Sequence, residues 1–201
     1  MKKNTVKDLC MIAVFAAIIS IVGQFSIPLP GGVPMTLQTL IIALAGAVLG
    51  SKKGFWSTVI YILIGAIGVP VFAGWTGGIG AFMGMTGGFL VSFPLIALFT
   101  GLGDEIGVRL SASAGARGRK VISCVSLLIG VLVGYVLNYA VGSLWFMAVA
   151  QSNLATALTA CVIPFIPTSI LKAVLVLILG PVLKHSLEKA HVLEVRRTAA
   201  V

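Results

Sequence analysis

The stretch of residues 163–180, IPFIPTSILKAVLVLILG, holds a lysine inside an apolar run, and the interpretation of the chain depends on it. Lys172 is the one charged residue between Lys120 and Lys184. A cation at the centre of a bilayer costs about 2.5–3.5 kcal/mol on insertion scales, and less near an edge. We therefore expect Lys172 to have a function, most simply the binding of an anion. The alternative is that its ammonium, about one helical turn from the outer surface, extends to lipid head groups.

The residues before Lys172 strengthen the expectation of an anion site. Pro167 suits the first turn of a helix, and Thr168 and Ser169 are good cap residues. They precede Lys172 by four and three positions, so a helix carries all three on one face. The N-terminus of a helix already favours anions. The segment therefore predicts a carboxylate site built from Lys172, Ser169 and Thr168.

The composition indicates an integral membrane protein. The chain has 201 residues, of which 59% are hydrophobic and 9% are charged, whereas soluble domains carry about 25% charged residues. A net charge of +9 would raise the question of nucleic-acid binding in a soluble protein. Here the basic residues flank apolar segments, where they set orientation and contact anionic membrane lipid. We expect one membrane domain over residues 1–201 and no nucleic-acid partner.

Six apolar segments predict an all-α membrane protein, a six-transmembrane-helix bundle. A spanning helix needs about 20 residues, so the second and fourth segments are short. The apolar segment 143–166, broken by Pro164, is expected to form an outer surface helix or a re-entrant segment. Residues 184–201 are expected to form a basic cytoplasmic tail. The six segments are residues 9–25, 36–50, 55–69, 88–103, 121–142 and 167–183.

The distribution of charge predicts the orientation of these segments. Basic residues lie before the first segment, after the sixth, and in alternate connections between them. The other connections, near residues 26–35, 71–87 and 143–166, contain no charged residue. By the positive-inside rule both termini are cytoplasmic. The start of the chain resembles a signal peptide, but Asp8 and the lack of a clear cleavage site favour a retained first helix.

Polar and aromatic residues near the uncharged connections are further ligand candidates. The amides of Asn138 and Gln38 can bond to a neighbouring helix or face a ligand. The connection 71–87 carries several aromatic residues, including Trp75, and predicts either a lid over an apolar ligand or an interfacial aromatic belt. Paired small residues, Gly130 with Gly134 and Ala13 with Ala17, allow close helix approach; for the glycines we favour packing inside the chain.

No catalytic or metal-binding pattern is visible in the sequence. There is no P-loop, no HExxH or GxSxG motif and no pair of carboxylates within an apolar segment. The three cysteines do not have the spacing of a metal site. We therefore expect neither an enzyme nor a metal or other cofactor. A pocket with one cation and no energy source of its own indicates the substrate-binding subunit of a larger transporter.

Three segments resemble BioY, the biotin-binding S component of energy-coupling-factor (ECF) transporters. They are AVFAAIISIVGQFSIPLPGGVPMTLQTLIIALAGAVLGSKKG at 13–54, LIGAIGVPVFAGWTGGIGAFMGMTGGFLVSFP at 63–94 and PFIPTSILKAVL at 164–175. The resemblance covers roughly residues 9–185. It implies six membrane helices, capture of biotin from outside, and a bacterial cell (plasma) membrane location. It also implies a transmembrane coupling subunit and two ATPase subunits, which use the ATP. Ala13 and Ala17 match the AxxxA pattern through which first helices of the family contact the coupling subunit.

The chain departs from the family at three positions. Ser169 replaces a common aspartate, Phe89 replaces a common tyrosine, and Trp75 stands where glycine is frequent. These changes bear on ligand hydrogen bonding, so an S component for a related vitamin or a biotin analogue is a second hypothesis. A non-transport membrane structural protein is a third. Lys172 could pair with the carboxylate of biotin or donate to its ureido oxygen. The candidate ligand-binding residues are Lys172, Ser169, Thr168, Asn138, Gln38, Trp75 and Phe89.

Overall fold

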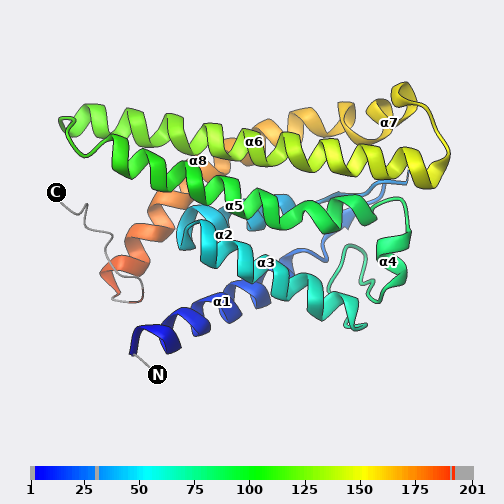
Figure 1. Ribbon diagram of the computed structural model, residues 1–201, viewed down its shortest axis with the longest axis horizontal. Coiled ribbons are helices and arrows are strands. Elements are labelled where there is room, and N and C mark those ends of the chain that lie inside the picture. Colours follow the sequence, from blue (N-terminus) through cyan, green and yellow to red (C-terminus); the bar gives the residue numbers. More distant parts are fainter. Residues whose placement is uncertain (1–2, 30–31, 191, 193–201) are drawn as a thin grey trace.

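The computed structural model describes residues 3–29, 32–190 and 192, and they form a bundle of helices (Figure 1). Two short antiparallel strands, β1 and β2, pair Ser26 with Thr36 ahead of the second helix. The helices are α1 Lys3–Val22, α2 Gln38–Leu49, α3 Ser51–Ala66, α4 Gly80–Met83, α5 Gly87–Leu110, α6 Ala116–Ala150, α7 Leu154–Cys161, the 3₁₀-helix η1 Ile163–Phe165 and α8 Ile166–Lys189. The strands are β1 Ser26–Ile27 and β2 Met35–Thr36.

Each of the six predicted apolar segments overlaps one helix, and these helices differ in length. Four helical segments are long and apolar enough to cross a membrane: 5–22, 87–110, 116–150 and 154–189. The last of these combines α7, η1 and α8. Helix α2 has 12 residues and α3 has 16, fewer than the roughly 20 that a span normally requires. The chain is thus a multi-pass helical protein, and the count of six spans stays a prediction.

Two predicted boundaries are wrong. Helix α6 continues to Ala150 rather than ending at 142, because residues 143–150 contain no glycine or proline and all of them except Ser143 are apolar. The predicted separate segment 143–166 is therefore divided between the end of α6, α7 and η1. The tail predicted from residue 184 is helical up to Lys189. The remainder of that tail, apart from Ala190 and Val192, lies outside the described residues.

Glycines bring α5 and α6 into close contact along their length (Figure 1). A Cβ atom added at Gly130 would lie 2.9 Å from the Cα of Gly103, and one added at Gly134 would lie 3.0 Å from the Cα of Ile96. Side chains at either position would force the backbones apart. The prediction that Gly130 and Gly134 pack inside the chain is confirmed.

Helix α2 lies at the centre of the bundle. It contacts α3, α5 and α8, and all of its residues except Thr39 and Ile41 are buried. A Cβ at Gly46 would collide with the backbone of Ala97 on α5. Because α2 is covered by protein, its length need not match the thickness of a bilayer. This helix carries the polar residues of the site at its first turn.

Charged residues tie the helices together at one end of the bundle. Lys53 pairs with Asp8, and Lys184 pairs with Asp104 at 2.5 Å. The carboxylate of Glu105 accepts hydrogen bonds from the amide and hydroxyl of Ser51, at 2.9 and 2.8 Å, which satisfies an otherwise free amide at the start of α3. Figure 1 shows the start of α1 and the end of α8 on the side of the α5–α6 turn, whereas α4 and α7 lie on the other.

Candidate ligand-binding site

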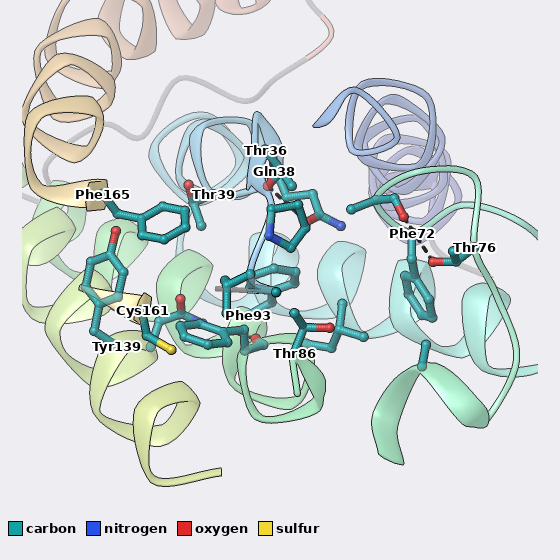
Figure 2. Close-up of a pocket in the computed structure, with 18 of the residues that line it drawn as sticks. Thr36, Gln38, Thr39, Phe72, Thr76, Thr86, Phe93, Tyr139, Cys161 and Phe165 are labelled. Carbon is teal, nitrogen blue, oxygen red and sulfur yellow. Dashed lines mark hydrogen bonds between the residues drawn. The ribbon is translucent and has the colours of Figure 1, made fainter. Parts of the chain in front are cut away.

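A cavity of about 240 Å³ lies between α2, α5, α6 and α8, toward the end of the bundle that holds α4 and α7. Figure 2 shows Tyr139, Cys161 and Phe165 at one end of this cavity and Phe72 and Thr76 at the other. Between them lie residues from the first turn of α2. The lining residues are Gly32, Val33, Pro34, Thr36, Gln38, Thr39, Phe72, Ala73, Thr76, Ala81, Thr86, Phe89, Leu90, Phe93, Asn138, Tyr139, Cys161, Phe165 and Lys172.

Lys172 points from α8 toward α2 and is only 8% exposed. Its ammonium donates to the carbonyl oxygen of Thr36 at 2.7 Å and to Thr39 Oγ1 at 3.0 Å. In the described part of the chain no carboxylate pairs with it. An ammonium has three N–H donors, so one is left for a ligand in the cavity. The alternative of an ammonium that extends to lipid head groups is wrong, because the side chain is buried against α2.

Gln38 lines the cavity, but its amide is largely held by the protein. Its Nε2 donates to the hydroxyl of Tyr61 at 2.6 Å, and its Oε1 accepts from Thr36 Oγ1 at 3.0 Å. Tyr61 is fully buried and donates in turn to the carbonyl oxygen of Val71. This chain of hydrogen bonds fixes the start of α2, and with it the two threonines that hold Lys172.

Asn138 bonds to a neighbouring helix and also lines the cavity. Its Nδ2 donates to the carbonyl oxygen of Phe89 at 3.1 Å and to Ser92 Oγ at 2.7 Å, so the amide joins α6 to α5. Asn138 is also one of the residues that line the cavity. No described residue donates to its Oδ1, and an amide oxygen can accept two hydrogen bonds. This oxygen is therefore free to accept from a ligand.

Aromatic rings form the apolar wall of the cavity. Phe89 and Tyr139 meet edge to face with their centroids 6.4 Å apart, and Tyr139 lies 6.5 Å from Phe165. The hydroxyl of Tyr139 shares a 2.6 Å hydrogen bond with Ser169 on α8. An apolar wall with a few fixed polar groups is typical of a site for a small organic ligand.

Four of the seven predicted ligand residues line the cavity, namely Lys172, Asn138, Gln38 and Phe89. Thr168 and Ser169 do not. Helix α8 begins at Ile166, so both lie inside its first turn rather than at its cap. The hydroxyl of Thr168 bonds back to the carbonyl oxygen of Phe165 at 2.9 Å, and Ser169 is occupied by Tyr139. Both hydroxyls are therefore bonded to protein groups, and neither residue lies where it would contact a ligand in the cavity.

Trp75 also lies outside the cavity. Its side chain is 69% exposed, and its φ of 62° falls in the left-handed region that favours glycine. That backbone conformation explains why a glycine is suited to the position. Phe72 of the same loop, 1% exposed, lines the cavity in its place.

The sequence interpretation missed Thr36, Thr39 and Phe165. The two threonines stand in the same PMTLQTL segment as Gln38, and a polar residue on each side of Gln38 was the available signal. Phe165 was read as part of a broken apolar segment. Its place in the site depends on the 3₁₀ turn at η1, which no local pattern predicts.

The predicted partner surface on α1 faces outward. Ala13 and Ala17 are exposed, on the side of α1 opposite Phe15 and Ile19, which are buried. Packing inside the chain therefore does not explain the pair. A contact with another protein stays a prediction.

Comparison with known proteins gives a consistent result. The BioY family model matches residues 1–189. A probable biotin transporter BioY of Pyrococcus horikoshii is 37% identical over 174 residues, which cover 87% of this chain and 94% of that protein. Biotin transporter BioY2 of Lactococcus lactis subsp. cremoris is 35% identical over 187 residues, covering 93% and 95%. The crystal structure of the S-component for biotin from an ECF-type ABC transporter matches with a TM-score of 0.75 and 29% identity, covering 92% of this chain and 94% of that one.

Proposed function

Since this chain belongs to the BioY family, we propose that it captures biotin for uptake as the S component of an ECF transporter. The observation that carries the proposal is Lys172, a buried cation beside a cavity with no carboxylate partner among the described residues. Biotin is a small molecule with a carboxylate tail, an apolar thioether ring and a ureido group. The aromatic wall suits the ring, and the ammonium suits either oxygen-bearing end.

Two poses of biotin follow from these groups. In the first, Lys172 pairs with the carboxylate, which neutralises a charge that is costly to bury. In the second, Lys172 donates to the ureido oxygen, and the acceptor Asn138 Oδ1 suits a ureido N–H. Biotin methyl ester distinguishes them, because the ester removes the negative charge and leaves the ureido group unchanged. A large loss of affinity supports the first pose, and an affinity near that of biotin supports the second.

We further propose six membrane-spanning helices with both termini in the cytoplasm. The uncharged connections and the gathering of ion pairs at the opposite end of the bundle support this orientation. The short helix α2 acts as a span in this arrangement because protein covers most of it. Helix α3, with 16 residues, is close to the lower limit of about 17 for a spanning helix. The ligand cavity then opens to the outside of a bacterial cell membrane. Labelling by an impermeant maleimide tests the two sides, with single cysteines placed at Ser113 and Thr76 in a variant whose Cys10, Cys124 and Cys161 are replaced with alanine.

Transport requires partners, since no ATP-binding motif occurs in this chain. We propose a transmembrane coupling subunit and two ATPase subunits. The outward-facing Ala13 and Ala17 support a closely packed contact between α1 and a helix of the coupling subunit. Biotin binding itself needs only this chain and involves no chemical change of the ligand.

Calorimetric titration of the purified protein with biotin tests the proposal. We expect saturable binding of one biotin per chain, and weaker binding of desthiobiotin, which lacks the thioether ring. Tighter binding of desthiobiotin or another vitamin would favour the hypothesis of a related ligand. No heat and no ligand-dependent thermal shift with any of them would favour a membrane protein of structural function.

A further inference from the structure

A second cavity, of about 630 Å³, lies at the other end of the same helices. The ligand cavity is lined by the start of α5 and of α8, near Phe89 and Lys172. The second is lined by the end of α5, the first turns of α6 and the end of α8, near Asp104, Arg119 and His185. It is independent of the biotin site, and the transport function does not explain it.

The walls of this second cavity differ in polarity from one part to another. Leu127, Leu177 and Pro181 supply apolar surface, and the Ser111 and Ser123 hydroxyls lie beside each other at 3.5 Å. Arg119 and Lys120 are exposed at the start of α6. The cavity thus combines apolar walls with a basic border. This combination is complementary to a phospholipid, which has apolar acyl chains and an anionic phosphate.

The balance of charge in the second cavity is positive. Asp104 is bound to Lys184 at 2.5 Å, and both side chains are largely buried, so this pair neutralises itself. Arg119 and Lys120 form no ion pair in the described part of the chain. Glu188 also lines the cavity and offsets one of these charges. One positive charge therefore remains.

The start of α6 adds to the attraction for an anion. Its N-cap is Gly115, so no side chain accepts a hydrogen bond from the first amides, and its first turn holds no acidic residue. A helix N-terminus of this kind carries a partial positive charge. The same turns hold Arg119 and Lys120.

We propose that this cavity binds an anionic phospholipid, with its phosphate at Arg119 and Lys120 and an acyl chain against Leu127, Leu177 and Pro181. A free phosphate would use the basic residues but not the apolar wall. Val125 and Val182, which follow the lining residues Cys124 and Pro181 in sequence, are apolar and exposed. Basic pockets between membrane helices bind anionic lipid head groups in this way.

Native mass spectrometry of the full chain in detergent, titrated with dioleoyl phosphatidylglycerol, tests the proposal. The Arg119→Gln/Lys120→Gln variant removes two positive charges from the cavity. The Lys52→Gln/Arg109→Gln variant removes two exposed charges that lie neither on the cavity lining nor at the start of α6, and it is the matched control. We expect the first variant to bind the lipid about tenfold more weakly than the wild type, and the control to bind within about twofold of it. Circular dichroism and thermal unfolding verify that both variants are folded.

Competition measurements with two further compounds show whether the lipid binds through its negative charge, its acyl chains or both. Dioleoyl phosphatidylcholine, with the same chains and no net charge, should compete poorly, and glycerol phosphate should not compete at millimolar concentration. Equal loss in both variants, or equal binding of the two lipids, would overturn the proposal. Effective competition by glycerol phosphate would identify a phosphate site and overturn it too. If the Arg119→Gln/Lys120→Gln variant bound the lipid as the wild type does but no longer bound a partner protein, the two basic residues would form a protein contact, and the lipid proposal would be overturned.

Discussion

The ammonium of Lys172 donates a 3.0 Å hydrogen bond to the hydroxyl of Thr39, which joins α8 to the first turn of α2 at the wall of the ligand cavity. The same ammonium binds the Thr36 carbonyl oxygen at 2.7 Å. Two neutral acceptors hold the cation in place without neutralising it. This geometry keeps the charge available to a ligand.

Replacing Thr39 with valine removes one of the two acceptors that orient Lys172. Hydrogen bonds to charged groups contribute about 1.5–3 kcal/mol, and the Thr36 carbonyl oxygen remains. We therefore expect Thr39→Val to weaken biotin binding about three- to tenfold in calorimetric titration. Thr39→Ser, which keeps the hydroxyl, should bind within about twofold of the wild type. Equal affinities for the valine and serine variants would show that the Thr39 hydroxyl does not orient the ammonium.

Replacing Asn138 with alanine should reduce both stability and binding. The change removes the hydrogen bonds that Asn138 donates to the Phe89 carbonyl oxygen and the Ser92 hydroxyl, of which only the carbonyl oxygen keeps another side-chain donor, Ser92. The expected cost is about 1–3 kcal/mol. It also removes the free Oδ1 acceptor. Thermal unfolding in detergent and biotin titration measure the two effects. Gln24→Ala is the control, because the Gln24 side chain makes no hydrogen bond in the described part of the chain. A stable Asn138→Ala protein with normal binding would contradict both roles.

Replacing Trp75 with glycine should leave biotin binding within about twofold of the wild type, since the indole is exposed and outside the cavity. Glycine also adopts the positive φ at this position without strain, so the thermal midpoint should not fall. The result distinguishes the two predictions for residues 71–87, a lid over the ligand and an interfacial aromatic belt. A tenfold loss of affinity would mean that Trp75 closes over the ligand, as a lid residue does.

Replacing Gly130 with alanine should destabilise the contact of α6 with α5, because the added Cβ would collide with the backbone of Phe99 and Gly103. Overpacking of this kind costs about 1–3 kcal/mol. Gly80→Ala at the start of α4 is the matched control, since a Cβ there meets no atom within 4 Å. Thermal unfolding should show a lower midpoint for Gly130→Ala alone. Similar midpoints for the two variants would contradict the close approach of the helices.

Replacing Ala13 and Ala17 together with leucine should leave biotin binding unchanged and prevent association with the coupling subunit. The larger side chains would keep a partner helix from approaching α1. Co-purification with the coupling subunit and the ATPases measures the effect, and Ala148→Leu, exposed on α6, is the control. Normal co-purification of the double variant would place the coupling contact elsewhere.

The sequence was sufficient to place most of the helices and to single out Lys172, which the structure places on the lining of the cavity. Apolar segments and charge predict where helices lie, because lipid requires every spanning backbone group to bond within its own helix. Lys172 was identifiable because a buried cation stands out from its neighbours. The prediction that Thr168 and Ser169 line the ligand site is not met. Helical spacing predicts which residues lie next to Lys172, but it does not predict which side of the helix lines the cavity. The turn at Phe165 and the exposed position of Trp75 depend on tertiary contacts and backbone angles that no short pattern reports.

Titration of biotin into purified wild-type, Lys172→Met and Lys172→Arg proteins tests the central claim most directly. Methionine keeps the bulk of the side chain and removes its charge and donors. We expect Lys172→Met to bind biotin about tenfold or more weakly than the wild type while remaining folded, and Lys172→Arg to retain part of the lost affinity. Equal affinity of the wild-type and methionine proteins for biotin would contradict the account.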